Sequence, residues 1–292
     1  MKRSAPGSYK RKNRDQEPKS LFGTLVAHYA GKIFTDVCGA APNVKKYEKL
    51  FENGDPERIL GGHPAKYGDW PWLINVGGIC TGSIIHPQWA LCAKHCQTLP
   101  GEKIKEIRYG TVKKNRGKVM AVTETFMVDD SDKLDNEDII LLKLAEPIKF
   151  TSKVHAICLA ANISHESGVQ NAVAGWGRNE HTHQNRDHAY ENSVPIRPNE
   201  YCDPRGKYNF DKEFCAGSLE HGTTGGDSGG PIMALKNGRW FLHGITSKGF
   251  YRRQINGTLE DHGVYTDATS YCDWIEEKTN GDVKCQDDVY EK

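Results

Sequence analysis

The sequence lacks any uninterrupted apolar run of the roughly 20 residues that a membrane-spanning helix requires. Neither sign of charge predominates, since the formal net charge of the 292 residues is +1 at pH 7. Cysteine pairs with the CxxC spacing of zinc sites are missing, and no carboxylate-lined calcium loop is evident. These absences argue against a membrane span, against nucleic acid as a partner and against a metal or other cofactor.

Helical periodicity is also scarce in the sequence. Much of the chain consists of short apolar runs, such as 72–76, 139–144 and 240–245, separated by glycine, proline, asparagine and aspartate. Runs of this length with such boundaries are typical of β-strands. Residues 271–279 alone have a helical pattern of any length, so we expect an all-β protein with a short helix near its C-terminus.

Among the motifs that are present, GGDSGGP at 225–231 is the most informative, because it sets Ser228 among glycines. Glycines leave backbone N–H groups uncovered beside the hydroxyl group, so this segment can attack a carbonyl carbon and bind the resulting oxyanion. A serine hydroxyl is a weak nucleophile, and the reaction requires a histidine base and a carboxylate that orients the base. His95 in ALCAKHC and Asp138 in DNEDIILLKL can supply both groups.

The order of these three residues, and the motifs around them, resemble the chymotrypsin/trypsin family of serine proteases. RILGG at 58–62 resembles the activation junction of that family, and GDWPW at 68–72 its first strand. The segments CTGSII, AGWG, FCAG, ITSKG, GVYT and YCDWI follow in family order, so the resemblance covers roughly residues 38–280. It implies two antiparallel six-stranded β-barrels, a short C-terminal helix and an active site between the barrels.

The resemblance also implies a role for each residue of this triad. His95 accepts the proton of Ser228 during attack on the scissile carbonyl, and Asp138 orients His95 and stabilises its charged form. The backbone amides of Gly226 and Ser228 form the oxyanion hole. Ser247 donates a further hydrogen bond to Asp138.

The RILGG segment implies that the chain is made as an inactive precursor. Cleavage between Arg58 and Ile59 frees an ammonium group at Ile59, which folds inward and pairs with Asp227. Before cleavage the buried carboxylate has no partner, so Asp227 cannot settle in the active arrangement. An ordinary loop that leads into a strand is the alternative for this segment.

The same resemblance divides the chain into segments. Residues 1–37 are basic, and we expect them to be disordered or to be a poor signal region, because no convincing targeting signal is present. The remaining segments are a propeptide or light chain at 38–58, a peptidase domain at 59–280 with barrels at about 59–163 and 164–280, and an acidic C-terminal tail at 281–292.

Nine cysteines are too many for a typical cytosolic protein, so we expect disulfides. Two disulfides that are usual in the family are missing, and in each case both cysteines are absent. Asn171 and Ala234 stand in place of one cysteine pair, and Thr224 stands in place of one cysteine of the other pair. Cys272 can pair with Cys285, or one of these can pair with Cys92, which leaves one odd thiol in either case. By resemblance the other pairs are Cys38–Cys158, Cys80–Cys96 and Cys202–Cys215.

Secretion is inferred from this cysteine content and from two glycosylation sequons, at Asn162 and Asn256. The histidines of HTHQNRDH, His181, His183 and His188, are better explained by a polar loop than by a metal site, since no cysteine or spaced carboxylate completes a ligand shell. No metal is therefore expected.

The specificity pocket is expected to be neutral. Gly222 stands six residues before the serine, where enzymes that cut after lysine or arginine carry an acidic residue. With glycine walls, this floor predicts a large apolar or aromatic residue before the scissile bond. An acidic residue recruited by His221, Lys248, Arg252 or Arg253 is the alternative. The lining residues implied by the resemblance are Gly222, Thr223, Ser247, Gly249 and Gly263.

We therefore expect a secreted, monomeric serine endopeptidase that acts on proteins or peptides and is subject to protein inhibitors. A neutral pocket does not accept Arg58, so activation is expected to need a separate trypsin-like protease. The alternative is a protease-like binding or regulatory protein that has lost catalysis. The unusual residues that favour this alternative are Lys94 before the histidine, Cys92, Lys248 and Gly225, which precedes the oxyanion glycine.

Overall fold

The structure is a computed structural model, and it describes residues 38–52, 62–98, 101–129, 137–179, 181–206, 208 and 210–287. Six antiparallel strands form a first closed barrel in the order β2-β3-β4-β7-β6-β5. Most positions in β2, β3, β4 and β7 are buried, as expected for strands whose sequences are nearly continuous apolar runs. The strands are β2 (Leu73–Val76), β3 (Cys80–His86), β4 (Trp89–Cys92), β5 (Glu106–Tyr109), β6 (Lys118–Met127) and β7 (Ile140–Leu144).

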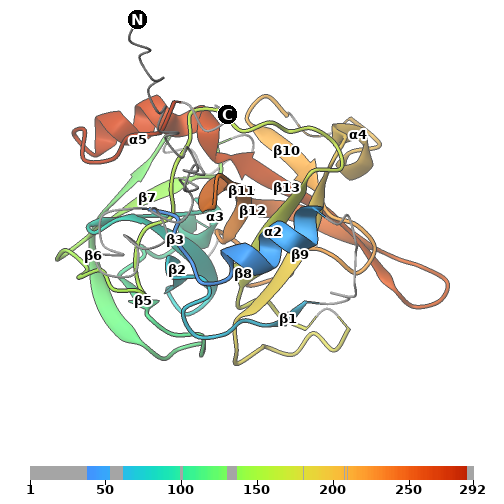
Figure 1. The fold of residues 1–292 in the computed structure, drawn as a ribbon, viewed down its shortest axis with the longest axis horizontal. Helices are drawn as coiled ribbons and strands as arrows, with labels where there is room; N and C mark the ends of the chain where they lie inside the picture. Colours follow the sequence, from blue (N-terminus) through green and yellow to red (C-terminus); the bar gives the residue numbers. More distant parts are fainter. Residues whose placement is uncertain are drawn as a thin grey trace, which may run out of the picture. The chain divides into compact units, whose positions relative to one another are not determined.

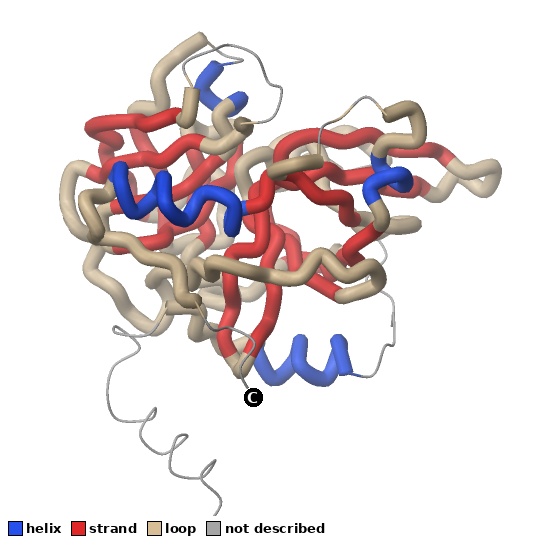
Figure 2. Tube along the Cα trace, turned by 90° about the horizontal axis from the view of Figure 1, so that it is seen from above, coloured by secondary structure: helices blue, strands red, loops and turns tan. Residues whose placement is uncertain are grey.

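A second barrel follows, with strand order β9-β10-β13-β12-β11-β8 and closure through the pairing of β8 with β9. The short β1 (His63–Pro64) adds to the edge of β9. Figures 1 and 2 show the two barrels side by side. The strands are β8 (Gln170–Gly175), β9 (Tyr190–Arg197), β10 (Glu213–Ala216), β11 (Pro231–Lys236), β12 (Arg239–Arg253) and β13 (Leu259–Asp267).

The predicted pair of six-stranded barrels with a short C-terminal helix is confirmed. The helix α5 (Cys272–Lys278) follows a 3₁₀ turn, η1 (Ala268–Tyr271), in which the Thr269 N–H group donates to the capping side chain of Asp267. Within the part of the chain that the structure describes, no helix is long and apolar enough to cross a membrane.

The expectation that 271–279 alone is helical was wrong, because α2 (Val44–Glu52) lies in the segment before the first barrel (Figure 1). Tyr47 of α2 is fully buried, and its ring packs edge-on against Trp70 and Trp240. Asn43, just before the helix, accepts a hydrogen bond from Trp240 Nε1 at 3.0 Å. A nine-residue helix is marginal by itself, so contacts with distant residues stabilise it, and the local sequence does not reveal them. Two further helices of one turn each are α3 (His95–Thr98) and α4 (Asn199–Cys202).

Four disulfides are present in the described residues. Three join the pairs implied by the family resemblance, and the fourth joins Cys272 to Cys285, which leaves Cys92 as a buried free thiol. The Cys272–Cys285 bond holds the chain after α5 against the body, where the N–H of Gln286 donates to Leu159 O at 3.0 Å. The acidic tail is therefore packed as far as the structure describes it, to residue 287.

A hydrogen bond between buried polar side chains occupies the region of one missing disulfide. Asn171 Oδ1 lies 3.0 Å from Nδ1 of His243, and both residues are fully buried. The His243 ring packs against both Phe214 and His165, and its Nε2 atom has no partner among the described residues. Burial lowers the pKa of His243 well below its ordinary value of 6.5.

Stability should therefore fall in mild acid. The unfolded chain takes up a proton at this position below pH 6.5, whereas folded His243 stays neutral, so stability present above pH 6.5 is lost as the pH falls toward the folded pKa. We expect about 1 kcal/mol less free energy of unfolding at pH 5.5 than at pH 7.5 from this residue. Guanidinium unfolding of the wild-type and His243→Phe chains at both pH values measures the difference. Equal pH dependence in the two chains would contradict it.

Candidate active site

Two loops of the first barrel bring His95 and Asp138 together. His95 begins α3 directly after β4, and Asp138 lies just before β7. Strands β4 and β7 pair antiparallel, with Cys92 opposite Ile140, so the end of one strand meets the start of the other. His95 Nδ1 is 2.7 Å from Asp138 Oδ2, and the His95 backbone N–H donates to Asp138 Oδ1 at 2.9 Å. The predicted pair is thus held by two hydrogen bonds in a buried position.

The second barrel supplies further partners for Asp138. Ser247 Oγ in β12 donates to Asp138 Oδ2 at 2.6 Å, as expected from the sequence, and Thr266 Oγ1 in β13 donates to the Asp138 carbonyl at 3.1 Å. Burial by itself raises the pKa of Asp138, but the hydrogen bonds and charge of His95 and the bond from Ser247 outweigh it and lower the pKa. Asp138 is therefore ionised at neutral pH and able to orient the His95 ring.

Ser228 lies in a tight turn at the start of β11, against the first barrel. Its carbonyl oxygen accepts a hydrogen bond from the Thr81 N–H at 2.9 Å and lies 3.7 Å from Sγ of Cys96, the residue after the histidine. Gly229 has φ of +78°, and a Cβ atom there would lie 2.3 Å from Cys92 Sγ. This position therefore requires glycine both for its backbone conformation and for space.

The side chain of Ser228 makes no hydrogen bond to the His95 ring among the described residues. The structure brings their backbones together through β3 and α3 but does not record contact of the hydroxyl group with the base. The N–H groups of Gly226 and Ser228, the predicted oxyanion hole, also have no acceptor in the described part of the chain. Gly226 has φ of +105°, and its carbonyl oxygen accepts from Thr81 Oγ1 at 2.9 Å, which turns the peptide at this point.

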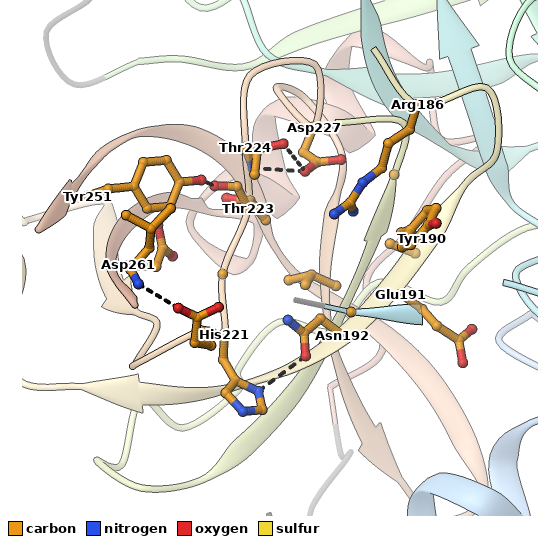
Figure 3. A pocket seen from close by; sticks show the side chains of 17 residues that line it. Arg186, Tyr190, Glu191, Asn192, His221, Thr223, Thr224, Asp227, Tyr251 and Asp261 are labelled. Atoms are coloured by element: carbon orange, nitrogen blue, oxygen red, sulfur yellow. Dashed lines mark hydrogen bonds between the residues drawn. The ribbon is translucent and has the colours of Figure 1, made fainter. Parts of the chain in front are cut away.

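Asp227 lines a pocket that does not include Ser228, and we call it the Asp227 pocket (Figure 3). Its carboxyl group accepts hydrogen bonds from the N–H groups of Gly177 at 2.7 Å and Thr224 at 2.8 Å. Arg186 extends its guanidinium group into the same pocket on the side of Asp227. Burial nevertheless raises the pKa of Asp227. Gly62 also lines this pocket, whereas Arg58 and Ile59 lie outside the described residues.

A second cavity opens at the nucleophile, and we call it the Ser228 pocket. Four of the five expected lining residues contribute to it, namely Thr223, Ser247, Gly249 and Gly263, while Gly222 faces the Asp227 pocket. Gly249 and Gly263 are paired across β12 and β13, so no side chain narrows this wall. Tyr251 and Asp261 are among the lining residues that sequence reasoning missed, and the register of this hairpin places them opposite each other.

Tyr251 joins the hairpin to the segment before the serine, because its hydroxyl group donates to the carbonyl oxygen of Thr223. This hydrogen bond links the two segments near the place where the family's second missing disulfide would lie. The pocket loops are therefore connected without that disulfide.

The residues considered as metal ligands do not form a site. His181 pairs with Glu220 at 3.3 Å, and His188 Nε2 bonds the carbonyl of Ala65 at 2.8 Å. Among the described residues, ligand atoms of His95, Cys80 and Cys96 lie within 4.8 Å of one another. The two sulfurs are joined in a disulfide, so they are not thiolate ligands.

Comparisons with known proteins agree with this geometry. The family model described as Trypsin matches residues 59–275. Coagulation factor XI of Bos taurus is 32% identical over 281 residues, which cover 88% of this chain and 43% of that protein. An ovochymase of Halocynthia roretzi is 34% identical over 239 residues, which cover 75% of this chain and 15% of that protein. The chain thus spans less than half the length of either relative.

Cys92, behind the serine turn, should be chemically inert in the folded protein. It is fully buried and donates to Thr81 O at 3.2 Å, and burial raises the pKa of its thiol. A thiol that remains protonated and inaccessible does not react with alkylating agents. We expect mass spectrometry to find no iodoacetamide adduct on native protein and one adduct per chain, at Cys92, after unfolding without reductant. Modification of Cys92 in the native protein would contradict this placement.

Proposed function

Because the chain belongs to the trypsin family of serine proteases, we propose that it is a serine endopeptidase acting through Ser228, His95 and Asp138. The observation that carries the proposal is the buried carboxylate of Asp138, which receives two hydrogen bonds from His95 and one from Ser247. This arrangement favours the tautomer of His95 in which Nδ1 carries the proton and donates to Asp138. The Nε2 atom is then available as a base.

In the proposed reaction Ser228 Oγ attacks the scissile carbonyl carbon while His95 takes the hydroxyl proton. The carbonyl oxygen becomes an oxyanion, and the N–H groups of Gly226 and Ser228 donate to it. His95 then returns the proton to the leaving amine, which leaves an acyl-enzyme that water hydrolyses with His95 again as the base. Asp138 stays ionised throughout and stabilises the imidazolium form of His95.

We propose that cleavage after Arg58 activates the enzyme. Three observations support a salt bridge between the new Ile59 ammonium group and Asp227. Asp227 is partly buried, desolvation raises the pKa of its carboxyl group, and Gly62 lines the same pocket only three residues after Ile59. The ammonium group would supply a counter-charge and favour ionised Asp227.

Secretion is part of the proposal, as are protein or peptide substrates, control by protein inhibitors, and a monomeric state. The four disulfides favour an oxidising compartment, and the sequon residues Asn162 and Asn256 are both exposed. The preference for a large apolar residue before the scissile bond rested on a neutral floor at Gly222. Asp261 lines the Asp227 pocket together with Gly222, and its carboxyl group argues against that neutrality.

The triad is tested with the full chain cleaved after Arg58. We expect one fluorophosphonate label on wild-type protein and none on Ser228→Ala, because the probe reacts with the activated hydroxyl group. Asp138→Asn should reduce kcat on a peptide substrate by about 10⁴-fold, because His95 then adopts the wrong tautomer. A cleaved, folded wild-type chain that takes no label would instead support a non-catalytic, protease-like binding protein.

The activation salt bridge is tested by Asp227→Asn. After cleavage at Arg58, the activity of this variant should be about 100-fold or more below that of wild type, because the buried ammonium group then lacks its anion. Asp187→Asn is the matched control, since Asp187 is an exposed carboxylate in the neighbouring loop. Activity assays before and after cleavage give the gain for each chain. An undiminished gain in Asp227→Asn would overturn the salt bridge and leave the triad unaffected.

A further inference from the structure

The carboxyl group of Asp261 occupies the space that a side chain at position 222 would take. A Cβ atom added to Gly222 would lie 2.0 Å from both Cγ and Oδ2 of Asp261, far inside van der Waals contact. Gly217 faces the same oxygen, and a Cβ atom there would lie 2.8 Å from it. An acidic group is thus present over Gly222, but it comes from β13 and not from position 222 itself.

This carboxyl group is buried and incompletely hydrogen-bonded. Asp261 is 4% exposed, and the nearby backbone N–H groups of Thr223 and His262 offset only part of the effect of burial on the pKa of its carboxyl group. Its Oδ2 atom has no partner among the described residues. Burial, together with the nearby charge of Asp227, raises the pKa of Asp261 well above its ordinary range. A buried carboxyl oxygen without a donor is costly, and a cationic donor from outside the chain would remove that cost.

Asp261 lines the Ser228 pocket as well as the Asp227 pocket, where Figure 3 shows it beside Tyr251 and Thr223. Other polar groups lie close to it. Thr223 Oγ1 is 3.4 Å from the hydroxyl group of Tyr265, which is buried under Gly263. The cavity next to the nucleophile is therefore lined by the carboxyl group of Asp261 and also by Lys248, whose ammonium group is paired with Glu213. Its glycine wall leaves room for a long side chain.

We propose that Asp261 determines the specificity of the Ser228 pocket, and that this pocket takes the arginine or lysine side chain of the residue before the scissile bond. The inference rests on the proposed endopeptidase function and names the substrate class for that site. The guanidinium or ammonium group supplies the hydrogen-bond donors and the positive charge that the Oδ2 atom of Asp261 lacks.

The other side chains considered for this pocket fit less well. A large apolar group would cover Asp261 without giving it a donor. An acidic group would meet the Asp261 carboxyl group, and two nearby basic residues that could attract it are already engaged. Lys248 Nζ pairs with Glu213 at 2.8 Å, and His221 Nδ1 lies 2.9 Å from the Ser193 carbonyl oxygen.

The proposal is tested on the full chain cleaved after Arg58, with active sites counted by fluorophosphonate labelling. Peptide substrates that differ only in the residue before the scissile bond, arginine, lysine, phenylalanine or glutamate, are compared by kcat/KM. We expect arginine and lysine to exceed phenylalanine and glutamate by about 100-fold or more. Asp261→Asn should lower kcat/KM for arginine by about 100-fold, because it removes one partner of a buried charge pair, and change the phenylalanine value little.

Glu260→Gln is the matched control. Glu260 is the preceding residue of β13, but its carboxyl group bonds Tyr201 Oη at 3.0 Å and Gln254 Nε2 at 2.8 Å, away from the pocket. This variant should keep the arginine preference of wild type. If Asp261→Asn lowered all four substrates equally, or if wild type preferred phenylalanine or glutamate, the proposal would be wrong. If wild type took no fluorophosphonate label, the endopeptidase function itself would fail.

Two measurements avoid dependence on the folding of Asp261→Asn. Benzamidine should inhibit the wild-type enzyme, whereas its uncharged analogue benzamide should not, since only the amidinium group is a cation. The double variant Asp261→Ala with Gly222→Asp moves the carboxylate from position 261 to position 222. The space vacated by the Asp261 side chain can hold it there. This double variant should recover most of the arginine activity lost in Asp261→Asn. Equal inhibition by the two compounds would overturn the proposal.

Discussion

The carboxyl group of Asp138 accepts hydrogen bonds from both barrels. His95 reaches it from the first barrel and Ser247 from the second, and Thr266 holds its backbone carbonyl from β13. An ionised carboxylate in a buried position is tolerated only when several donors replace water. The donors come from elements far apart in the sequence, so the orientation of the histidine depends on both barrels.

Close approach of side chains to glycine is the second constraint on this site. Cβ atoms at Gly175 and Gly177 would lie 2.3 and 2.1 Å from the carboxyl oxygens of Asp227, and one at Gly222 would overlap Asp261. In each case the missing side chain gives space to a buried carboxyl group. The glycines of the GGDSGGP region and its surroundings therefore have two functions: they expose amides near Ser228 and make room for acids behind it.

Motifs that are short and continuous in the sequence predicted the barrels, the His95–Asp138 pair and the three family disulfides. Features created by contacts between distant segments could not be predicted in this way. The helix around Tyr47 depends on Trp70 and Trp240, and the hydrogen bond of Asn171 depends on His243, 72 residues away. Asp261 was missed because its role depends on the register of β12 with β13, which brings it opposite Tyr251 and over Gly222.

Asp227 and Asp261 are linked electrostatically, because the charge of Asp227 contributes to the raised pKa of Asp261 and both line one pocket. In the part of the chain that the structure describes, no ion pair joins either carboxyl group to a basic side chain, and the charge of Arg186 offsets only part of the rise in the pKa of Asp227. The proposed Ile59 ammonium group would neutralise Asp227, reduce its repulsion of a second negative charge and so favour the ionised form of Asp261. A basic substrate side chain would then meet a carboxylate and not a protonated acid. On this argument, cleavage after Arg58 prepares the recognition of substrate as well as the oxyanion hole, and Arg58 itself belongs to the residue class that the pocket accepts.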